Sequence, residues 1–267
     1  MERKLKGRLR NILLARYTDL TPMGRYHPDD IFIISYPKSG SNWLRTMFAG
    51  IIHGLDLEYA QPALVSELVP GHKTKYYKRF QTPMFFRFHA LLHRSFRRVI
   101  YLIRDGRDAI VSYHHHTQTV KQKSVDLLDV VEGREFIQPF NFSWAQHVRA
   151  WQGNPFKANL ITVRYEDLLT DTVGELGRLL EFAGIETGTD GLEGIAKAAS
   201  FEKMREREKR LGNTNSAWPP GQQFMRRGIA GSHKDEKSAE ALRAFLDQSA
   251  QTLTSLGYLT PETPQPL

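Results

Sequence analysis

Cysteine is absent from the 267-residue sequence, which excludes disulfide bonds and thiolate metal sites. Long apolar runs are missing too, since none approaches the roughly 18 consecutive apolar residues of a membrane-spanning helix. The N-terminus also lacks the apolar stretch and small-residue cleavage site of a secretory signal. These absences favour a cytoplasmic protein.

Positive charge is concentrated near the N-terminus. The sequence has 37 Lys and Arg residues against 29 Asp and Glu residues, a net charge of +8. Six of the basic residues and one acid lie within residues 1–16, so the rest of the chain has 31 basic and 28 acidic residues and a net charge of only +3. A remainder so close to neutral argues against a nucleic-acid-binding surface, and no nucleic-acid partner is expected.

Residues 1–20 are expected to form a basic amphipathic arm. Its apolar residues recur at helical spacing: Leu5, Leu9, Ile12 and Leu13. Two interpretations stay open, namely peripheral contact of residues 1–16 with an anionic membrane surface, or packing of the apolar side on the domain.

Apolar runs alternate with helical patterns along the chain. The runs predict four strands, at Ile31–Ile34, Met84–His89, Arg98–Ile103 and Leu160–Arg164. This alternation is typical of a parallel sheet covered on both faces, so we predict a three-layer α/β/α fold. No repeat or linker is apparent, and residues 1–267 are expected to form one domain with a loose, proline-containing tail at 258–267.

Three segments carry more specific signals. Thr172 and Glu175 have the capping-box form and predict a helix that ends at Gly184. Trp144, His147 and Trp151 predict a helix with its aromatic side packed inward, which we expect to flank an acceptor pocket. By contrast, Asp56–Gln81 has no firm period and is expected to be an irregular excursion above the sheet.

The loop between the first predicted strand and its helix is suited to binding phosphate. Gly40 and small polar residues precede the helix N-terminus, where unpaired N–H groups and the helix dipole favour an anion. The nucleotide-binding P-loop has the pattern G-x-x-x-x-G-K-[ST], but here Lys38 precedes the glycine. No acidic strand end offers an obvious Mg²⁺ ligand either, so phosphate binding without a metal is expected.

Four segments resemble one family. Tyr36–Trp43 closely resembles the 5′-phosphosulfate loop of the cytosolic-type sulfotransferases, which use 3′-phosphoadenosine 5′-phosphosulfate (PAPS) as donor. Tyr101–Tyr113 resembles the 3′-phosphate segment of the family, Val163–Leu168 its Tyr-Glu-Asp segment, and Phe224–Gly228 the region that closes over the 3′-phosphate. The segments occur in the family's order, and the resemblance runs from about Asp30 to Leu246.

The resemblance implies a P-loop-like strand-loop-helix and a donor-binding set. Residues at the 5′-phosphosulfate would be Lys38, Ser39, Gly40, Ser41 and Asn42. Residues at the 3′-phosphate would be Arg104, Ser112, Arg226, Arg227 and Gly228. The adenine would lie among Trp43, Tyr165 and Phe201. Of these residues, the Lys38–Asn42 loop, Arg104 and Tyr165 lie at the carboxyl ends of the predicted strands, where parallel sheets bind ligands.

Sulfuryl transfer needs a base for the acceptor and a cation at the leaving oxygen. A neutral imidazole suits the first task and the Lys38 ammonium suits the second. Phe86–His89 resembles the Lys-Thr-His segment that carries the catalytic histidine of the family, although Arg87 and Phe88 stand in place of lysine and threonine. We therefore expect His89 to be the base, with His93 as the alternative and with His114, His115 and His116 as packing or surface residues.

Two other functions remain open, a Mg²⁺-dependent kinase or nucleotidase and a non-catalytic protein that binds polyanions or membrane through its basic arm. The acceptor segments resemble nothing specific and suit a small-molecule, glycan or lipid-linked hydroxyl, or an amine. No segment resembles the C-terminal dimer motif of the animal enzymes, so the oligomeric state is not predicted.

Overall fold

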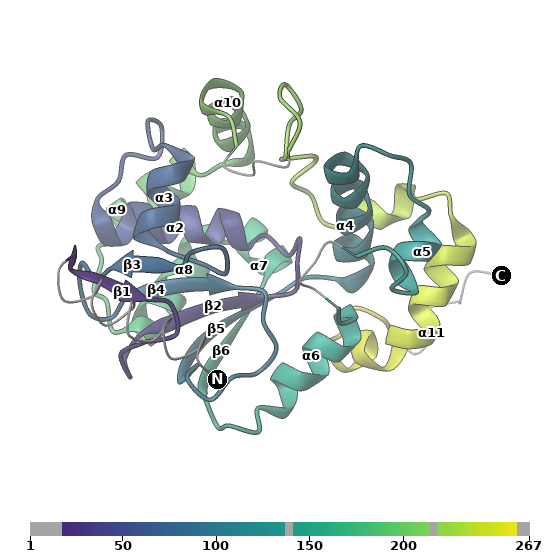
Figure 1. The fold of residues 1–267 in the computed structure, drawn as a ribbon, viewed down its shortest axis with the longest axis horizontal. Coiled ribbons are helices and arrows are strands. Elements are labelled where there is room, and N and C mark those ends of the chain that lie inside the picture. The colour runs from purple at the N-terminus through teal and green to yellow at the C-terminus, as the bar shows by residue number, and fades with distance from the viewer. Residues whose placement is uncertain (1–17, 137–140, 214–217, 261–267) are drawn as a thin grey trace, which may run out of the picture.

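A four-stranded parallel sheet forms the centre of the computed structural model, which describes residues 18–136, 141–213 and 218–260 (Figure 1). The strand order is β4 (Phe85–Phe88), β2 (Ile31–Ser35), β5 (Arg98–Ile103) and β6 (Asn159–Arg164). In this register Ile31 lies beside Phe85 on one side and Arg98 on the other. The four strands therefore end together at one edge of the sheet.

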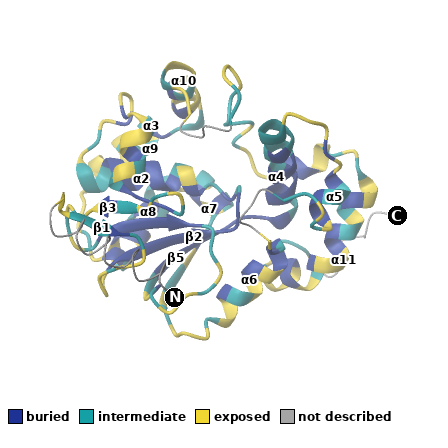
Figure 2. Ribbon diagram, in the orientation of Figure 1, coloured by how far each residue is buried: buried dark blue, intermediate teal, exposed yellow. Residues whose placement is uncertain are grey.

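Both faces of the sheet are covered by helices, and β2, β4 and β5 are buried almost completely, whereas the edge strand β6 is partly exposed (Figure 2). Ile31 and Ile33 point into one apolar core, while Phe32 and Ile34 point into the other. The first core includes residues of α2 (Ser41–His53), α3 (Pro62–Leu68), α7 (Tyr165–Thr170), α8 (Thr172–Ala183) and α9 (Thr189–Ala198). The second includes residues of α4 (Gly106–Lys121), α5 (Leu127–Val131), α6 (Trp144–Gly153) and α11 (Ala239–Ser255). This arrangement confirms the predicted three-layer fold.

The predicted strands agree with the structure to within one residue at each end. The helix from Trp144 is also confirmed, since Trp144, His147 and Trp151 are almost fully buried. The predicted cap of α8 is wrong, because the N-cap is Asp171, which accepts a hydrogen bond from Gly174, and Thr172 is already helical. An aspartate oxygen accepts a hydrogen bond from a free helix N–H as well as a threonine hydroxyl does, so the sequence alone could not distinguish Asp171 from Thr172 as the N-cap.

The segment expected to be an irregular excursion contains regular structure. It includes α3 and the short strand β3 (Tyr76–Lys78), which pairs antiparallel with β1 (Leu20–Pro22). The basic arm expected at residues 1–16 lies outside the described residues. Among the helices that the structure describes, none is long and apolar enough to cross a membrane.

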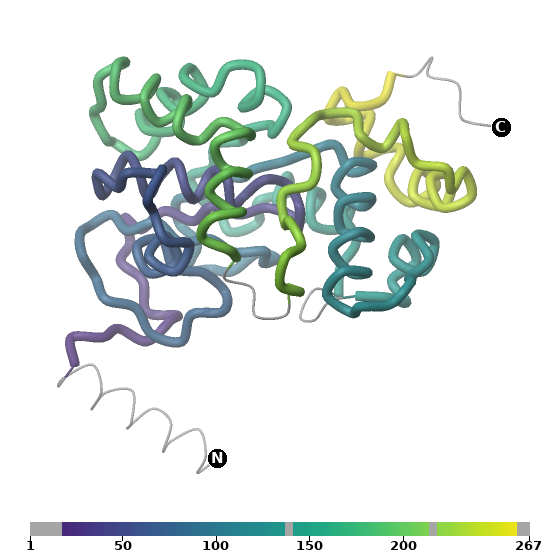
Figure 3. Tube along the Cα trace, turned by 90° about the horizontal axis from the view of Figure 1, so that it is seen from above, coloured from purple at the N-terminus to yellow at the C-terminus, as the bar shows by residue number. Residues whose placement is uncertain are grey.

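The chain that returns from residue 218 lies beside α10 (Phe201–Leu211), and Phe224 of this chain packs on Lys38 in the loop that follows β2 (Figure 3). Glu208 on α10 joins the two, because its carboxylate accepts hydrogen bonds from the N–H groups of Phe224 and Met225. From there the chain passes to the start of α4, where a 3₁₀ turn, η1 (Ser232–Asp235), packs.

Candidate active site

The loop between β2 and α2 forms an anion-binding turn. Lys38 and Gly40 both have positive φ, 68° and 96°, and Gly40 is the N-cap of α2 without a side-chain cap. Ser39 is fully buried, and its Oγ has no hydrogen-bond partner among the described groups. A buried hydroxyl beside uncapped helix N–H groups is a suitable environment for a phosphate oxygen.

Aromatic side chains gather beside this loop. Gly40 packs so closely against Tyr165 that a Cβ atom at position 40 would lie 2.6 Å from the ring. The Trp43 ring lies 6.0 Å from the Tyr165 ring, edge to face, and its Nε1 donates to the Ala199 carbonyl. Phe201 lies at the start of α10 and packs directly against Gly228. The structure thus brings together Trp43 and Tyr165, and places Phe201 against the predicted 3′-phosphate segment.

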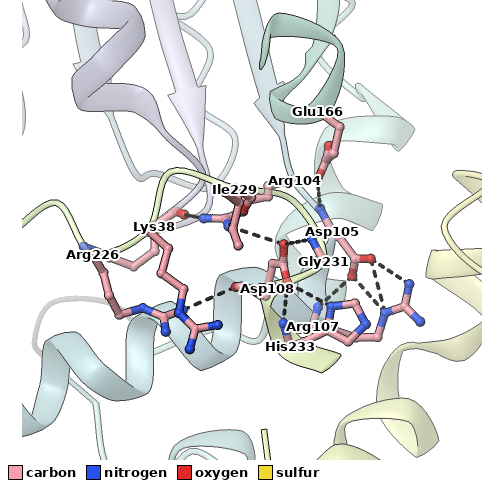
Figure 4. A network of polar contacts seen from close by, with 12 residues as sticks. Lys38, Arg104, Asp105, Arg107, Asp108, Glu166, Arg226, Ile229, Gly231 and His233 are labelled. Atoms are coloured by element: carbon pink, nitrogen blue, oxygen red, sulfur yellow. Dashed lines mark hydrogen bonds and ion pairs between the residues drawn. The ribbon is translucent and has the colours of Figure 1, made fainter. Parts of the chain in front are cut away.

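Asp108 is the centre of a second polar cluster (Figure 4). It is fully buried on α4 and accepts hydrogen bonds from the N–H groups of Gly231 and His233, each at 2.8 Å, and from His233 Nδ1 at 2.8 Å. Burial alone would raise the pKa of Asp108, but the bonds from His233 and the nearby Arg104 lower it well below its usual range. The ionised carboxylate therefore fixes the returning chain on α4.

Arg104 connects the two loops (Figure 4). It is buried, and its Nη1 donates to the Lys38 carbonyl at 3.2 Å. Its Nη2 donates to the Ile229 carbonyl at 3.0 Å and to Asp108 at 3.3 Å, and its guanidinium lies 4.4 Å from the centre of the Tyr165 ring. One arginine thus holds the anion-binding turn, the aromatic cluster and the returning chain in a fixed arrangement.

The remaining predicted anion-binding residues are less enclosed. Arg226 is half-buried and donates to Ser232 Oγ at 3.3 Å, while Arg227 is exposed and pairs with Asp235. Ser112 is half-buried on α4, one turn beyond Asp108, and Asn42 is exposed at the start of α2. Of these four residues, Arg226 contributes to lowering the pKa of Lys38.

Lys38 lies in a strongly cationic environment. Its Nζ is 3.7 Å from the centre of the Phe224 ring. Burial, followed by the charge of Arg104, lowers the pKa of Lys38 to about 7, although Glu208 opposes the shift. The ammonium is therefore easily stabilised by a bound anion, which would restore its pKa.

His89 lies at the end of β4 with both ring nitrogens engaged. Its Nε2 is 2.8 Å from Arg87 Nη1, and because a guanidinium can only donate, Nε2 accepts this bond. Nδ1 must then carry the proton, which it donates to the Ser35 carbonyl at 2.9 Å. Burial and the charge of Arg87 lower the pKa of His89 well below its usual value. His93, the alternative base, is exposed, and its Nδ1 accepts a bond from Ser95 N–H.

Several residues of the site were not anticipated. Asp108 lies within the predicted 3′-phosphate segment, but no role was expected for it, although an acid four residues after Arg104 at the start of a predicted helix was a usable signal. His116 was expected to be a packing or surface residue, and its ring does stack on the Trp218 ring, with 5.3 Å between the ring centres. It also lies 5.7 Å from the ring of Phe224, which is the ring that Lys38 Nζ contacts. Contacts between α4 and the returning chain have no local signal in the sequence.

Among the described residues, one group could offer a metal ion three ligands within 4.8 Å of one another, namely His114, His115 and Glu236. Two of its three members already have hydrogen-bond partners. His114 Nε2 bonds the Val125 carbonyl, and Glu236 accepts from two N–H groups at the start of α11. Burial, followed by the charge of Arg226, lowers the pKa of His115 to about 4. This positively charged environment disfavours the binding of a divalent cation.

Replacement of Asp108 tests whether the second cluster is held by charge. Asp108→Asn removes the charge opposite buried Arg104 and is expected to lower the free energy of unfolding by about 3 kcal/mol, measured by urea denaturation. Asp235→Asn removes only the exposed partner of Arg227 and should leave the denaturation midpoint unchanged, as expected for a surface pair. Equal effects of the two substitutions would contradict a special role for Asp108.

The chain matches known proteins over most of its length. A family model described as "Sulfotransferase domain" matches residues 28–257. The chain is 32% identical over 238 residues to Sulfotransferase 2A6 of Rattus norvegicus, covering 81% of this chain and 82% of the relative. It is 28% identical over 231 residues to 3-beta-hydroxysteroid sulfotransferase of Cavia porcellus, covering 77% of each protein.

Two solved structures have the same fold at low sequence identity. Mouse sulfotransferase SULT7A1 complexed with PAP has a TM-score of 0.65 and 21% identity, and the match covers 87% of each chain. Retinol dehydratase in complex with androsterone and the inactive cofactor PAP has a TM-score of 0.67 and 18% identity, with 90% of this chain and 84% of the other covered.

Proposed function

Because the chain belongs to the sulfotransferase family and is a sulfotransferase, we propose that it transfers a sulfuryl group from PAPS to a hydroxyl or amine of a small molecule. The observation that supports this proposal is the pair of anion sites joined by Arg104. PAPS carries a phosphosulfate at its 5′ end and a phosphate at its 3′ end. The two relatives of known structure contain PAP, the same nucleotide without the sulfuryl group.

The proposed donor site uses the predicted residues. Lys38, Ser39, Gly40, Ser41 and Asn42 would hold the 5′-phosphosulfate at the N-terminus of α2. Arg104, Ser112, Arg226, Arg227 and Gly228 would hold the 3′-phosphate, for which a planar guanidinium is well shaped. Trp43, Tyr165 and Phe201 would pack the adenine between these sites.

In the proposed mechanism, His89 Nε2 accepts the proton of the acceptor hydroxyl. The acceptor oxygen forms a bond to sulfur while the bond from sulfur to the bridging oxygen breaks, and PAP leaves. The Lys38 ammonium stabilises the charge that develops on this bridging oxygen. Neutral His89, protonated at Nδ1 toward Ser35, is in the correct tautomer for this role.

Arg87 must release His89 before the base can act, because its Nη1 occupies the Nε2 lone pair. The same Nη1 lies 3.4 Å from Ser41 Oγ, directly beside the proposed phosphosulfate site. A charged sulfonate is a stronger hydrogen-bond acceptor than a neutral imidazole. Donor binding would therefore draw Arg87 away from His89 and leave Nε2 available to the acceptor.

The acceptor class is drawn from the relatives. One of them is named for a 3-beta-hydroxysteroid, and retinol dehydratase was crystallised with androsterone, so we propose a small alcohol or phenol. Glycan or lipid-linked acceptors remain proposals. Membrane contact through residues 1–16 is also a proposal, and these residues lie outside the described part of the chain.

Transfer of labelled sulfate from PAPS in excess chelator tests the function. The purified chain should label an acceptor from a small-molecule extract without added metal. Labelling only from γ-labelled ATP with Mg²⁺ would favour the kinase instead, and binding of polyanions without any transfer would favour the non-catalytic protein.

The affinity for PAP should fall as pH rises above about 7. The pKa of Lys38 is about 7 in the free protein, and a bound phosphate raises it, so the complex holds more protons than the free protein. Affinity is therefore greatest below pH 7 and declines by up to about tenfold per pH unit until the pKa of the complex is reached. Calorimetry from pH 6 to 9 measures this slope, and Lys38→Arg, which stays charged, should remove it.

A further inference from the structure

A second group of basic residues is connected to His89 through Arg87. Arg87 comes from β4, and the segment that ends in Gly71 runs along the edge of this strand, with Arg87 N–H bonded to the Pro70 carbonyl. His72 follows directly, and Arg45 reaches the same segment from α2. We call Arg45, His72 and Arg87 the edge cluster.

The two terminal nitrogens of Arg87 point in different directions. Nη1 lies toward Ser41 and His89, that is, toward the donor loop and the base. Nη2 lies toward His72, with Nη2 and the Nδ1 of His72 3.4 Å apart. The side chain is only 8% exposed, and its Nε has no hydrogen-bond partner among the described groups.

Arg45 adds a second buried charge. It is 8% exposed, and its Nε donates to the Val69 carbonyl at the C-terminus of α3. Its charge acts on both Arg87 and His72. Among the described residues, no carboxylate forms an ion pair with Arg45 or Arg87. Two buried guanidinium groups without a counter-ion are costly, and burial lowers the pKa of both, that of Arg87 to about 10.

The donor does not neutralise this charge. The phosphosulfate carries two negative charges, which Lys38, the N-terminus of α2 and the Nη1 side of Arg87 already match. The 3′-phosphate would lie near Arg104, Arg226 and Arg227. Arg45 and the Nη2 side of Arg87 thus remain for a different anion, and Arg87 itself contacts His89, the proposed base that the acceptor must approach.

We propose that the edge cluster binds an anionic group of the acceptor, so that the natural substrates are hydroxylated carboxylic acids or phosphates rather than neutral alcohols. The proposal rests on the function proposed above and specifies its substrate class. The competing explanation is structural, in which Arg45 only caps α3 and Arg87 serves only the donor. That explanation predicts no preference between charged and neutral acceptors.

The test compares hydroxy acids of aliphatic, phenolic and steroidal type with their methyl esters, using the full chain and labelled PAPS. We expect kcat/KM to be at least about tenfold higher for the acids, as for one charge-assisted hydrogen bond. Arg45→Met should reduce the acid-to-ester ratio by at least about tenfold, and Arg45→Lys should retain most of it. Arg98→Met is the matched control, because Arg98 also donates to a backbone carbonyl, that of Phe182, but at the opposite end of the strands.

Several outcomes would overturn the proposal. Esters used as well as acids by the unaltered protein, or an unchanged ratio in Arg45→Met, would show that the cluster does not select charge. A loss of PAP affinity in Arg45→Met but not in Arg98→Met, or a loss of folding in both Arg45 variants, would favour the structural role and overturn the proposal. Failure to label any acid, ester or extract would instead contradict the use of PAPS, and the proposed function with it.

Discussion

His89→Ala is expected to lower sulfuryl transfer by about 10²–10⁴-fold, the usual contribution of a general base. The imidazole lies at the end of β4, and its protonated Nδ1 on Ser35 leaves Nε2 as the only nitrogen that can accept a proton. PAP should bind nearly as well as before, because the predicted nucleotide contacts come from other strands and loops. Single-turnover transfer from labelled PAPS and calorimetry with PAP measure the two effects separately.

His93→Ala is the matched control for this substitution. It removes an exposed imidazole four residues further along the chain, and transfer should not change. Unaltered turnover in His89→Ala, or a large loss in His93→Ala, would move the base to another residue. A loss of PAP affinity equal to the loss of turnover would show that His89 supports the donor site rather than the chemical step.

The central sheet was predictable because each strand has a strong local signal. Residues 31–34 and 99–103 are continuous apolar runs, as expected for strands that are buried on both faces. The strand β3 was missed because it has three residues and its partner, β1, lies more than fifty residues away. Such pairing depends on tertiary contacts that leave no periodic pattern in a single sequence.

The position of the site followed from the fold, but its electrostatics did not. Parallel strands bring Lys38, His89, Arg104 and Tyr165 to one edge, and that much could be predicted from the order of the segments. The sequence marked Arg87 only as a departure from the family pattern. Its effect on His89 depends on a side-chain distance of 2.8 Å, and the buried position of Asp108 depends on a loop more than 120 residues away.

Lys38→Ala should impair donor binding and chemistry together, in contrast to His89→Ala. The lost ammonium is expected to weaken PAP binding by about tenfold or more, as for one charge-assisted hydrogen bond. The rate of single-turnover transfer at saturating donor should fall further, by about 10²–10³-fold, because the charge on the leaving oxygen develops only in the transition state.

Lys38→Arg separates charge from position in this experiment. The guanidinium keeps the charge, so PAP affinity should largely recover, but its planar shape cannot reproduce a compact ammonium in a turn where φ at residue 38 is already positive. The rate should therefore remain low. If both variants transferred sulfate at the original rate, the assignment of Lys38 would be wrong, and Arg87, whose Nη1 lies 3.4 Å from Ser41 Oγ, would be the next candidate for the cation at the leaving oxygen.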